Sequence, residues 1–183
     1  LLQGDVGSGK TVTAAAIAYS VVKNGYQVAF MAPTELLATQ HFETLKDFFK
    51  DLNVKTELIC GSMRAKAKRN AYENAALGIA DVVVGTHAII SDNLAFKNLG
   101  FIITDEQHRF GVNQRGKLAE KGDAPHVLVM SATPIPRSLA MIVYGDLDIS
   151  VLNSVLPGRQ KIDTFRITTD KRARMYGFLS NAI

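Results

Sequence analysis

The chain has 183 residues, of which 47% are hydrophobic and 21% are charged; these values are typical of a globular domain and exclude intrinsically disordered and collagen-like classes. No stretch approaches about eighteen apolar residues without a polar break, which excludes a membrane-spanning helix. A single cysteine, Cys60, excludes an internal disulfide and a multi-cysteine zinc site, and the net charge of +4 permits a polyanionic partner without requiring one.

Apolar runs rich in β-branched residues alternate with helical patterns along the chain. Most of the runs are continuously apolar, which is typical of strands buried on both faces of a parallel sheet. We expect strands at 27–33, 55–61, 81–87, 101–108 and 126–134. We expect helices at 10–23, 35–52, 63–78 and 135–144. This alternation predicts right-handed βαβ crossovers and an α/β three-layer sandwich with a mainly parallel sheet.

We expect the sequence to be part of a longer protein. It begins without Met, and only residues 1–3 precede a phosphate-binding pattern that normally follows a whole strand. The segment at 155–159 is typical of a linker, and a strand at 161–167 and a helix at 171–183 could begin a second domain. The predicted organisation is one domain at 1–154, truncated at its N-terminus, followed by the linker and these elements at 155–183.

The segment GDVGSGKT fits the pattern G-x-x-x-x-G-K-[ST] at every position. Glycines in such a loop turn backbone N–H groups toward phosphate oxygens, and the following helix directs its N-terminal dipole at the same anion. Lys10 would reach the β- and γ-phosphates and the Thr11 hydroxyl would ligate Mg²⁺. The expected nucleotide-binding residues are Gly4, Asp5, Val6, Gly7, Ser8, Gly9, Lys10 and Thr11. The alternative, a glycine-rich turn that only caps a helix, is disfavoured by the complete motif and the Ala-rich helical pattern after it.

Two carboxylates follow the apolar strand at 101–104. Buried carboxylates at a strand end are costly unless they hold a cation or a reacting water. Asp105 would therefore hold Mg²⁺, directly or through a water, and Glu106 would polarise the attacking water. The alternative is a solvated acidic turn, which is common by itself but is disfavoured when a phosphate loop belongs to the same sheet.

Five segments occur in the order of the motifs of superfamily 2 helicases, which the chain resembles. They are GDVGSGKT, APTELLATQH, GTHAII, DEQHRFG and SATPIPRSLAM, matching motifs I, Ia, Ib, II and III. The longer stretches DEQHRFGVNQRGKLAEKG and HVLVMSATPIPRSLAMIVYGDLDISVL are similar to one family, the bacterial RecG-type DNA helicases. The resemblance implies a RecA-like P-loop NTPase domain that uses ATP and Mg²⁺ and acts on branched or duplex DNA without sequence preference. It also implies a bacterial cytoplasmic protein associated with the nucleoid.

The resemblance assigns roles to matching residues. The catalytic set would comprise Lys10, Glu106, Gln107 and His108. Ser131 and Thr133 would couple hydrolysis to domain movement by contacting Gln107 or His108. The loops that follow the nucleic-acid backbone would contain Pro33, Thr34, Gly85, Thr86 and His87. The family further implies a wedge domain and a second motor domain in the same polypeptide, the latter supplying arginine fingers. It also predicts that the strand at 127–131 lies between the phosphate-loop strand and the strand at 101–104.

Three other interpretations of the residues stay open to different degrees. A DNA translocase of the transcription-repair coupling factor type shares HRFG, although its acidic box usually contains DEEH where this chain has Gln107. A nucleotide- and DNA-binding module with negligible catalysis is compatible with a fragment. A P-loop transferase such as a small kinase is disfavoured, because SATP follows DEQH.

Some single features have an ordinary structural interpretation. His41 is expected to be a surface or packing residue, and His126 a residue at the start of a strand. A solvated helix face is favoured over a DNA contact for one basic cluster. This cluster comprises Arg64, Lys66, Lys68 and Arg69.

Overall fold

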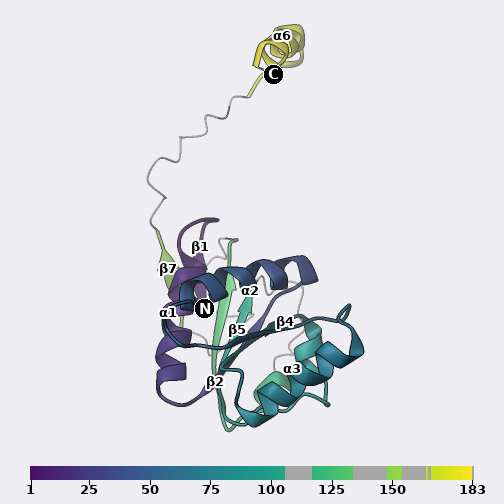
Figure 1. Cartoon of the computed structure of the whole chain (residues 1–183). Coiled ribbons are helices and arrows are strands. Elements are labelled where there is room, and N and C mark those ends of the chain that lie inside the picture. Colours follow the sequence, from purple (N-terminus) through teal and green to yellow (C-terminus); the bar gives the residue numbers. More distant parts are fainter. Residues whose placement is uncertain (106–116, 134–147, 154–163, 165, 183) are drawn as a thin grey trace.

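The computed structural model describes residues 1–105, 117–133, 148–153, 164 and 166–182, and within them a seven-stranded sheet forms the centre of the molecule (Figure 1). The strands are β1 (Leu2–Gly4), β2 (Gln27–Met31), β3 (Thr56–Ile59), β4 (Val82–Gly85), β5 (Leu99–Asp105), β6 (His126–Ser131) and β7 (Ser150–Leu152). They lie in the order β3-β4-β2-β5-β6-β1-β7, and each pairing is parallel. The predicted position of the strand at 127–131 is confirmed, because β6 pairs with β1 on one side and with β5 on the other.

The helix ends follow from the local sequence. The described helices are α1 (Lys10–Lys23), α2 (Glu35–Phe49), α3 (Ala65–Leu77) and α6 (Arg172–Ala182), with 3-10 turns η1 (His87–Ile90) and η3 (Thr169–Lys171). Gly25 (φ 84°) and Gly78 (φ 72°) have left-handed backbone just after α1 and α3, a conformation that glycine adopts at little steric cost. The hydroxyl of Thr34 accepts a hydrogen bond from the N–H of Leu37 at 3.3 Å and so caps α2.

Helices cover both faces of the sheet (Figure 1). On one face, α1 and α2 bury side chains such as Ala14 and Leu45 in a cluster that includes Phe30 of β2. On the other face, α3 and η1 contribute Ala71 and Ile89 to a second buried cluster. The predicted three-layer α/β sandwich is therefore confirmed. None of the described helices is long and apolar enough to cross a membrane.

Differences from the sequence prediction are concentrated in the last third of the chain. The sequence pattern does not predict β7, which pairs with β1 at the sheet edge and leaves Ser150 and Val151 exposed, so that no buried apolar run marks it. The strand expected at 161–167 is absent at residues 164, 166 and 167, whereas the expected C-terminal helix is present as α6. The expected helix at 135–144 and linker at 155–159 lie outside the described residues.

Candidate functional site

The phosphate-loop segment connects β1 to α1 at the carboxyl edge of the sheet. Gly7 (φ 78°) and Gly9 (φ 96°) both have left-handed backbone, which favours glycine. A side chain at Gly4 would collide with the hydroxyl of Ser8 and would lie 3.0 Å from Cβ of Leu152. Each glycine of the motif therefore has a steric reason to be glycine, and the loop is compact.

The polar groups of this loop suit an anion. The Nζ atom of Lys10 lies across the loop and donates to the carbonyl oxygens of Gly4 at 2.8 Å and Asp5 at 2.9 Å. The hydroxyl of Ser8 is buried and has no hydrogen-bond partner among the described residues. α1 begins after Gly9 without a side-chain cap, so its first N–H groups and its dipole are available to a ligand. A positively charged, N–H-lined loop with an unpaired buried hydroxyl fits the phosphates of a nucleotide.

Asp105 is held by a histidine from another element. It is the last residue of β5 and is 8% exposed. Its Oδ2 atom lies 2.7 Å from Nε2 of His41, which belongs to α2. His41 also packs against the ring of Phe30, with ring centroids 4.6 Å apart. The packing role expected for His41 is thus present, but its contact with Asp105 is one that the sequence analysis does not predict.

Neighbouring strands bring the phosphate loop and the acidic strand end together. Gln3 of β1 is opposite Ser131 of β6, and Asp105 of β5 is opposite Met130 of β6. The ends of these three strands therefore lie side by side at the carboxyl edge, as expected. In the described part of the chain, no group of three His, Cys, Asp or Glu side chains forms a metal cage. A hard cation such as Mg²⁺, which needs only one or two carboxylates when phosphate supplies other ligands, fits this donor set.

The two expected coupling residues contact each other. Ser131 is 1% exposed, and its hydroxyl lies 3.0 Å from the Thr133 hydroxyl and accepts the Thr133 N–H at 3.2 Å. Three further expected site residues lie outside the described residues: Glu106, Gln107 and His108. The predicted contact of Ser131 or Thr133 with this acidic segment therefore stays a prediction.

The loops expected to contact nucleic acid follow β2 and β4, which are neighbouring strands. Pro33 and Thr34 follow β2, and the Thr34 hydroxyl already caps α2. A side chain at Gly85 would collide with the backbone of the adjacent strand. Thr86 is 2% exposed, and its buried hydroxyl has no hydrogen-bond partner in the described part of the chain, whereas His87 is exposed. In this conformation a phosphate can reach the His87 side chain but not the Thr86 hydroxyl.

A carboxylate joins the loops after β2 and β3. Glu35, the first residue of α2, accepts hydrogen bonds from the Ser62 N–H at 3.0 Å and from the Ser62 hydroxyl at 2.5 Å. These bonds lower the pKa of Glu35 below its ordinary value of 4.5, and the nearby His87 lowers it further. Neither partner of this contact could be predicted from the sequence. Locally, Glu35 is an acid next to a helix cap and Ser62 belongs to a Gly-Ser turn. Neither feature indicates that the two residues are in contact.

The basic cluster divides into two parts. Arg69 is 3.9 Å from Glu73 in an exposed ion pair, and Nζ of Lys68 lies 5.8 Å from the ring centre of Tyr72. The remaining two members are exposed, and their side chains have no such partner among the described residues. They lie at the start of α3, beside the Gly-Ser turn. This part of the cluster adjoins the loop after β3.

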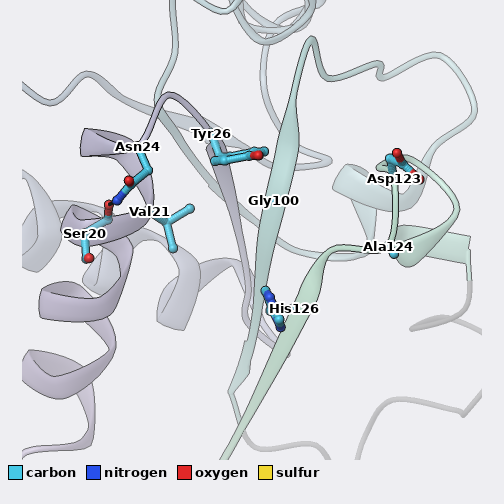
Figure 2. A pocket seen from close by; sticks show the side chains of 8 residues that line it. All are labelled: Ser20, Val21, Asn24, Tyr26, Gly100, Asp123, Ala124 and His126. Carbon is cyan, nitrogen blue, oxygen red and sulfur yellow. Dashed lines mark hydrogen bonds between the residues drawn. The ribbon is translucent and has the colours of Figure 1, made fainter.

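An open hollow of about 450 Å³ lies at the opposite, amino edge of the sheet (Figure 2). Its lining residues are Ser20, Val21, Asn24, Tyr26, Gly100, Asp123, Ala124 and His126. His126 is the exposed first residue of β6, so the interpretation of His126 as a strand-start residue is confirmed. Because the strands are parallel and the phosphate loop is at their other end, this hollow is separate from the candidate site.

These features match a known protein family. A family model described as DEAD/DEAH box helicase matches residues 1–142. The chain belongs to the DEAD/DEAH box helicase family. Two of its curated relatives carry the name ATP-dependent DNA helicase RecG. The protein of Aquifex aeolicus (strain VF5) is 51% identical over 178 residues, which is 96% of this chain and 22% of the relative. That of Streptococcus pneumoniae serotype 4 is 50% identical over 183 residues, which is 100% of this chain and 27% of the relative.

Solved helicase structures share the fold. A structure of RecG bound to a three-way DNA junction is 42% identical, with a TM-score of 0.82 over 97% of this chain and 24% of that chain. The Hef helicase domain of Pyrococcus furiosus is 23% identical, with a TM-score of 0.65 over 84% of this chain and 35% of that chain, and is informative for the fold alone. The predicted RecA-like fold and the resemblance to RecG-type helicases are both confirmed. The chain spans about a quarter of the length of its RecG relatives.

Proposed function

We propose that this chain is the first motor domain of an ATP-dependent DNA helicase of the RecG type, which remodels branched DNA such as forks and junctions. One observation carries the proposal: a complete phosphate loop, Asp105 and Ser131 lie together at one sheet edge. Similarity to RecG relatives over 96% to 100% of the chain supports it. In this proposal residues 1–154 form the ATP-binding domain, and residues 155–183 form a linker and the first elements of a second motor domain.

The chemistry follows from the charges at this edge. Lys10 would exchange its two loop carbonyl contacts for the β- and γ-phosphate oxygens of ATP, which are stronger acceptors for an ammonium group. Thr11 and Asp105 would hold Mg²⁺, which when bound neutralises charge on the transferred phosphoryl group. Glu106 would orient and polarise the attacking water. The Gly-rich loop would contribute the rest of the affinity for the nucleotide through its backbone N–H groups.

The proposed partners are DNA and the rest of the same polypeptide. The loops after β2 and β4 would contact the DNA backbone without reading bases, which suits a motor that passes over any sequence. The whole protein would add a wedge domain and a second motor domain, and cleft closure between the two motor domains would move the DNA. Bacterial relatives support a location in the cytoplasm, with nucleoid association through DNA.

A coupled ATPase assay tests this function in the chain and in the full-length protein. We expect full-length protein to hydrolyse ATP with Mg²⁺ and to be stimulated by forked DNA. The chain alone should be almost inactive, because it spans about a quarter of its relatives. That fraction also favours a second description of the isolated chain, as a nucleotide- and DNA-binding module with negligible catalysis. Full-length protein that hydrolyses no ATP, or ignores forked DNA, would contradict the proposal.

A further inference from the structure

The carboxylate of Asp105 has a defined orientation before any ligand is considered. Its Oδ2 atom is 2.7 Å from Nε2 of His41, and each side chain is 12% exposed. Because a carboxylate has no proton to give, Nε2 must carry the proton and donate it. The other oxygen, Oδ1, has no hydrogen-bond partner among the described residues. Within the described residues, one oxygen of Asp105 is therefore engaged and the other is available.

His41 is itself fixed on its far side. Its ring lies 4.6 Å, centroid to centroid, from the ring of Phe30, which is fully buried in β2. α2 is anchored to the sheet by the buried residues Ala38, Leu45 and Phe49, which lie on the same helix face as His41. The imidazole is thus held between an immobile ring and the carboxylate. It is 64 residues from Asp105 along the chain, so this contact depends on the packing of α2 against the sheet.

We propose that His41 is a positioning residue for the Mg²⁺ site: its Nε2–H holds Oδ2 of Asp105, which leaves Oδ1 for the cation or its hydration water. This inference rests on the proposed function, because it needs Asp105 to serve Mg²⁺. Hydrogen bonds to a ligating carboxylate fix its rotamer, and losing such outer partners typically costs about 10- to 100-fold in metal affinity. A histidine that only filled space would have no such effect on the metal.

The test compares Mg²⁺ dependence in full-length protein. His41→Phe keeps a ring beside Phe30 but has no N–H donor, whereas His41→Gln keeps a donor. His126→Phe, at the amino edge, is the matched control. Two readouts are the affinity of a fluorescent ATP analogue in EDTA and its affinity in excess Mg²⁺. The third is the Mg²⁺ concentration at which half of the change in affinity between these two conditions is reached.

We expect His41→Phe to raise the half-saturating Mg²⁺ concentration about 10-fold or more, with little change of nucleotide affinity in EDTA. His41→Gln should recover most of the Mg²⁺ dependence, and the control should match wild type. Placed in an Asp105→Asn background, His41→Phe should have no further effect on Mg²⁺, because it acts through Asp105.

Three outcomes would overturn the inference. They are an unchanged Mg²⁺ requirement in His41→Phe, an equal loss of affinity in EDTA and in Mg²⁺, and an effect that persists in the Asp105→Asn background. If His41→Phe does not fold, His41→Leu replaces it and the same comparison with His41→Gln decides. Failure of the proposed function would look different, because wild-type protein itself would then show no tightening of nucleotide binding by Mg²⁺.

Discussion

Single buried polar side chains hold distant segments of this domain together. Gln27 is 5% exposed at the start of β2, and its amide makes three hydrogen bonds. Nε2 donates to the carbonyl oxygens of Ala75 at 2.9 Å and Ala80 at 2.7 Å, and Oε1 accepts the N–H of Asn98 at 3.0 Å. One amide thus satisfies backbone groups from the end of α3 and from the entry to β5.

Replacing Gln27 should destabilise the fold through the groups it leaves unpaired. Two groups lose this hydrogen-bond partner, the Ala80 carbonyl and the Asn98 N–H, because the Ala75 carbonyl still accepts from the Gly78 N–H. At about 1–3 kcal/mol for each, we expect Gln27→Leu to lower the free energy of unfolding by about 2–6 kcal/mol. Gln27→Glu should cost more, because it removes both donors and places acceptor oxygens against two carbonyls. Urea denaturation measures both, with the exposed Gln40→Leu as control. A stable Gln27→Glu would show that the donors are unimportant.

The proposed roles of Lys10 and Glu106 separate binding from turnover. Lys10→Ala in the full-length protein should abolish hydrolysis and weaken nucleotide binding about 10- to 100-fold, because a charge-assisted contact to phosphate contributes about 1.5–3 kcal/mol. Glu106→Gln should bind nucleotide normally and lose turnover, because only the water-orienting carboxylate is changed. Titration with a fluorescent nucleotide and an ATPase assay check this pair. Equal loss of binding in both variants would refute the assigned roles.

At the scale of elements, three loops lie side by side at the carboxyl edge, because β3, β4 and β2 are neighbours. The loop after β2 leads into Glu35, and the loop after β3 contains Ser62, whose N–H and hydroxyl the Glu35 carboxylate accepts. His87, in the loop after β4, faces the same carboxylate closely enough to lower its pKa. Glu35 therefore joins the loops after β2 and β3 and lies near the loop after β4.

This link should depend on pH in a defined direction. The pKa of Glu35 is below its ordinary value of 4.5. The stabilisation by the hydrogen bonds between the Glu35 carboxylate and Ser62 is therefore fully present above pH 4.5 and is lost as the pH falls through the lowered pKa. Ser62→Ala should raise the pKa of Glu35 back toward 4.5, because Ser62 is the main cause of the shift. A carbon-detected NMR titration of the Glu35 carboxyl measures it, with Ser20→Ala as control. An unmoved pKa in Ser62→Ala would assign the shift to another cause.

The start of α3 is where the basic cluster adjoins these loops. Arg64 is exposed beside Ser62, whereas Arg69 lies further along α3 and is paired with Glu73. If Arg64 contacts a phosphate of duplex DNA, Arg64→Gln should reduce the slope of log affinity against log salt by about 0.9. Arg69→Gln is the matched control and should leave the slope unchanged. An unchanged slope in Arg64→Gln would assign Arg64 to solvent.

At the scale of the whole molecule, the chain should depend on parts of its protein beyond these residues. Arginine fingers from a second motor domain contribute about 10³–10⁵ in turnover, and the chain spans about a quarter of its relatives. We therefore expect the isolated chain to bind ATP weakly and to hydrolyse it slower than the full-length protein by about that factor. Single-turnover hydrolysis with both proteins measures the ratio. Turnover of the isolated chain equal to that of the full-length protein would show a site complete within it.

The sequence by itself determined the features that depend on local geometry. The phosphate loop could be predicted, because its glycines and its lysine at a helix start form a local pattern with a steric cause. The main helices and the parallel sheet could be predicted as well, because helical patterns alternate with continuous apolar runs. The order of β1, β6 and β5 could also be predicted, but through family resemblance and not through local pattern. Strand β7 could not, because an exposed edge strand of three residues needs no apolar run.

Only the tertiary structure decided which distant groups meet. His41 and Asp105 are 64 residues apart, Glu35 and Ser62 are 27 apart, and Gln27 and Ala75 are 48 apart. Each residue has an ordinary local interpretation, as a helix residue, a cap-adjacent acid or a strand start. Their pairing depends on how helices dock on the sheet, which follows from the sum of many weak apolar contacts that no short segment encodes. The physical reason is that a hydrogen bond between two elements can form only where packing brings those elements together. Turns and helix ends, in contrast, are determined by the residues that form them.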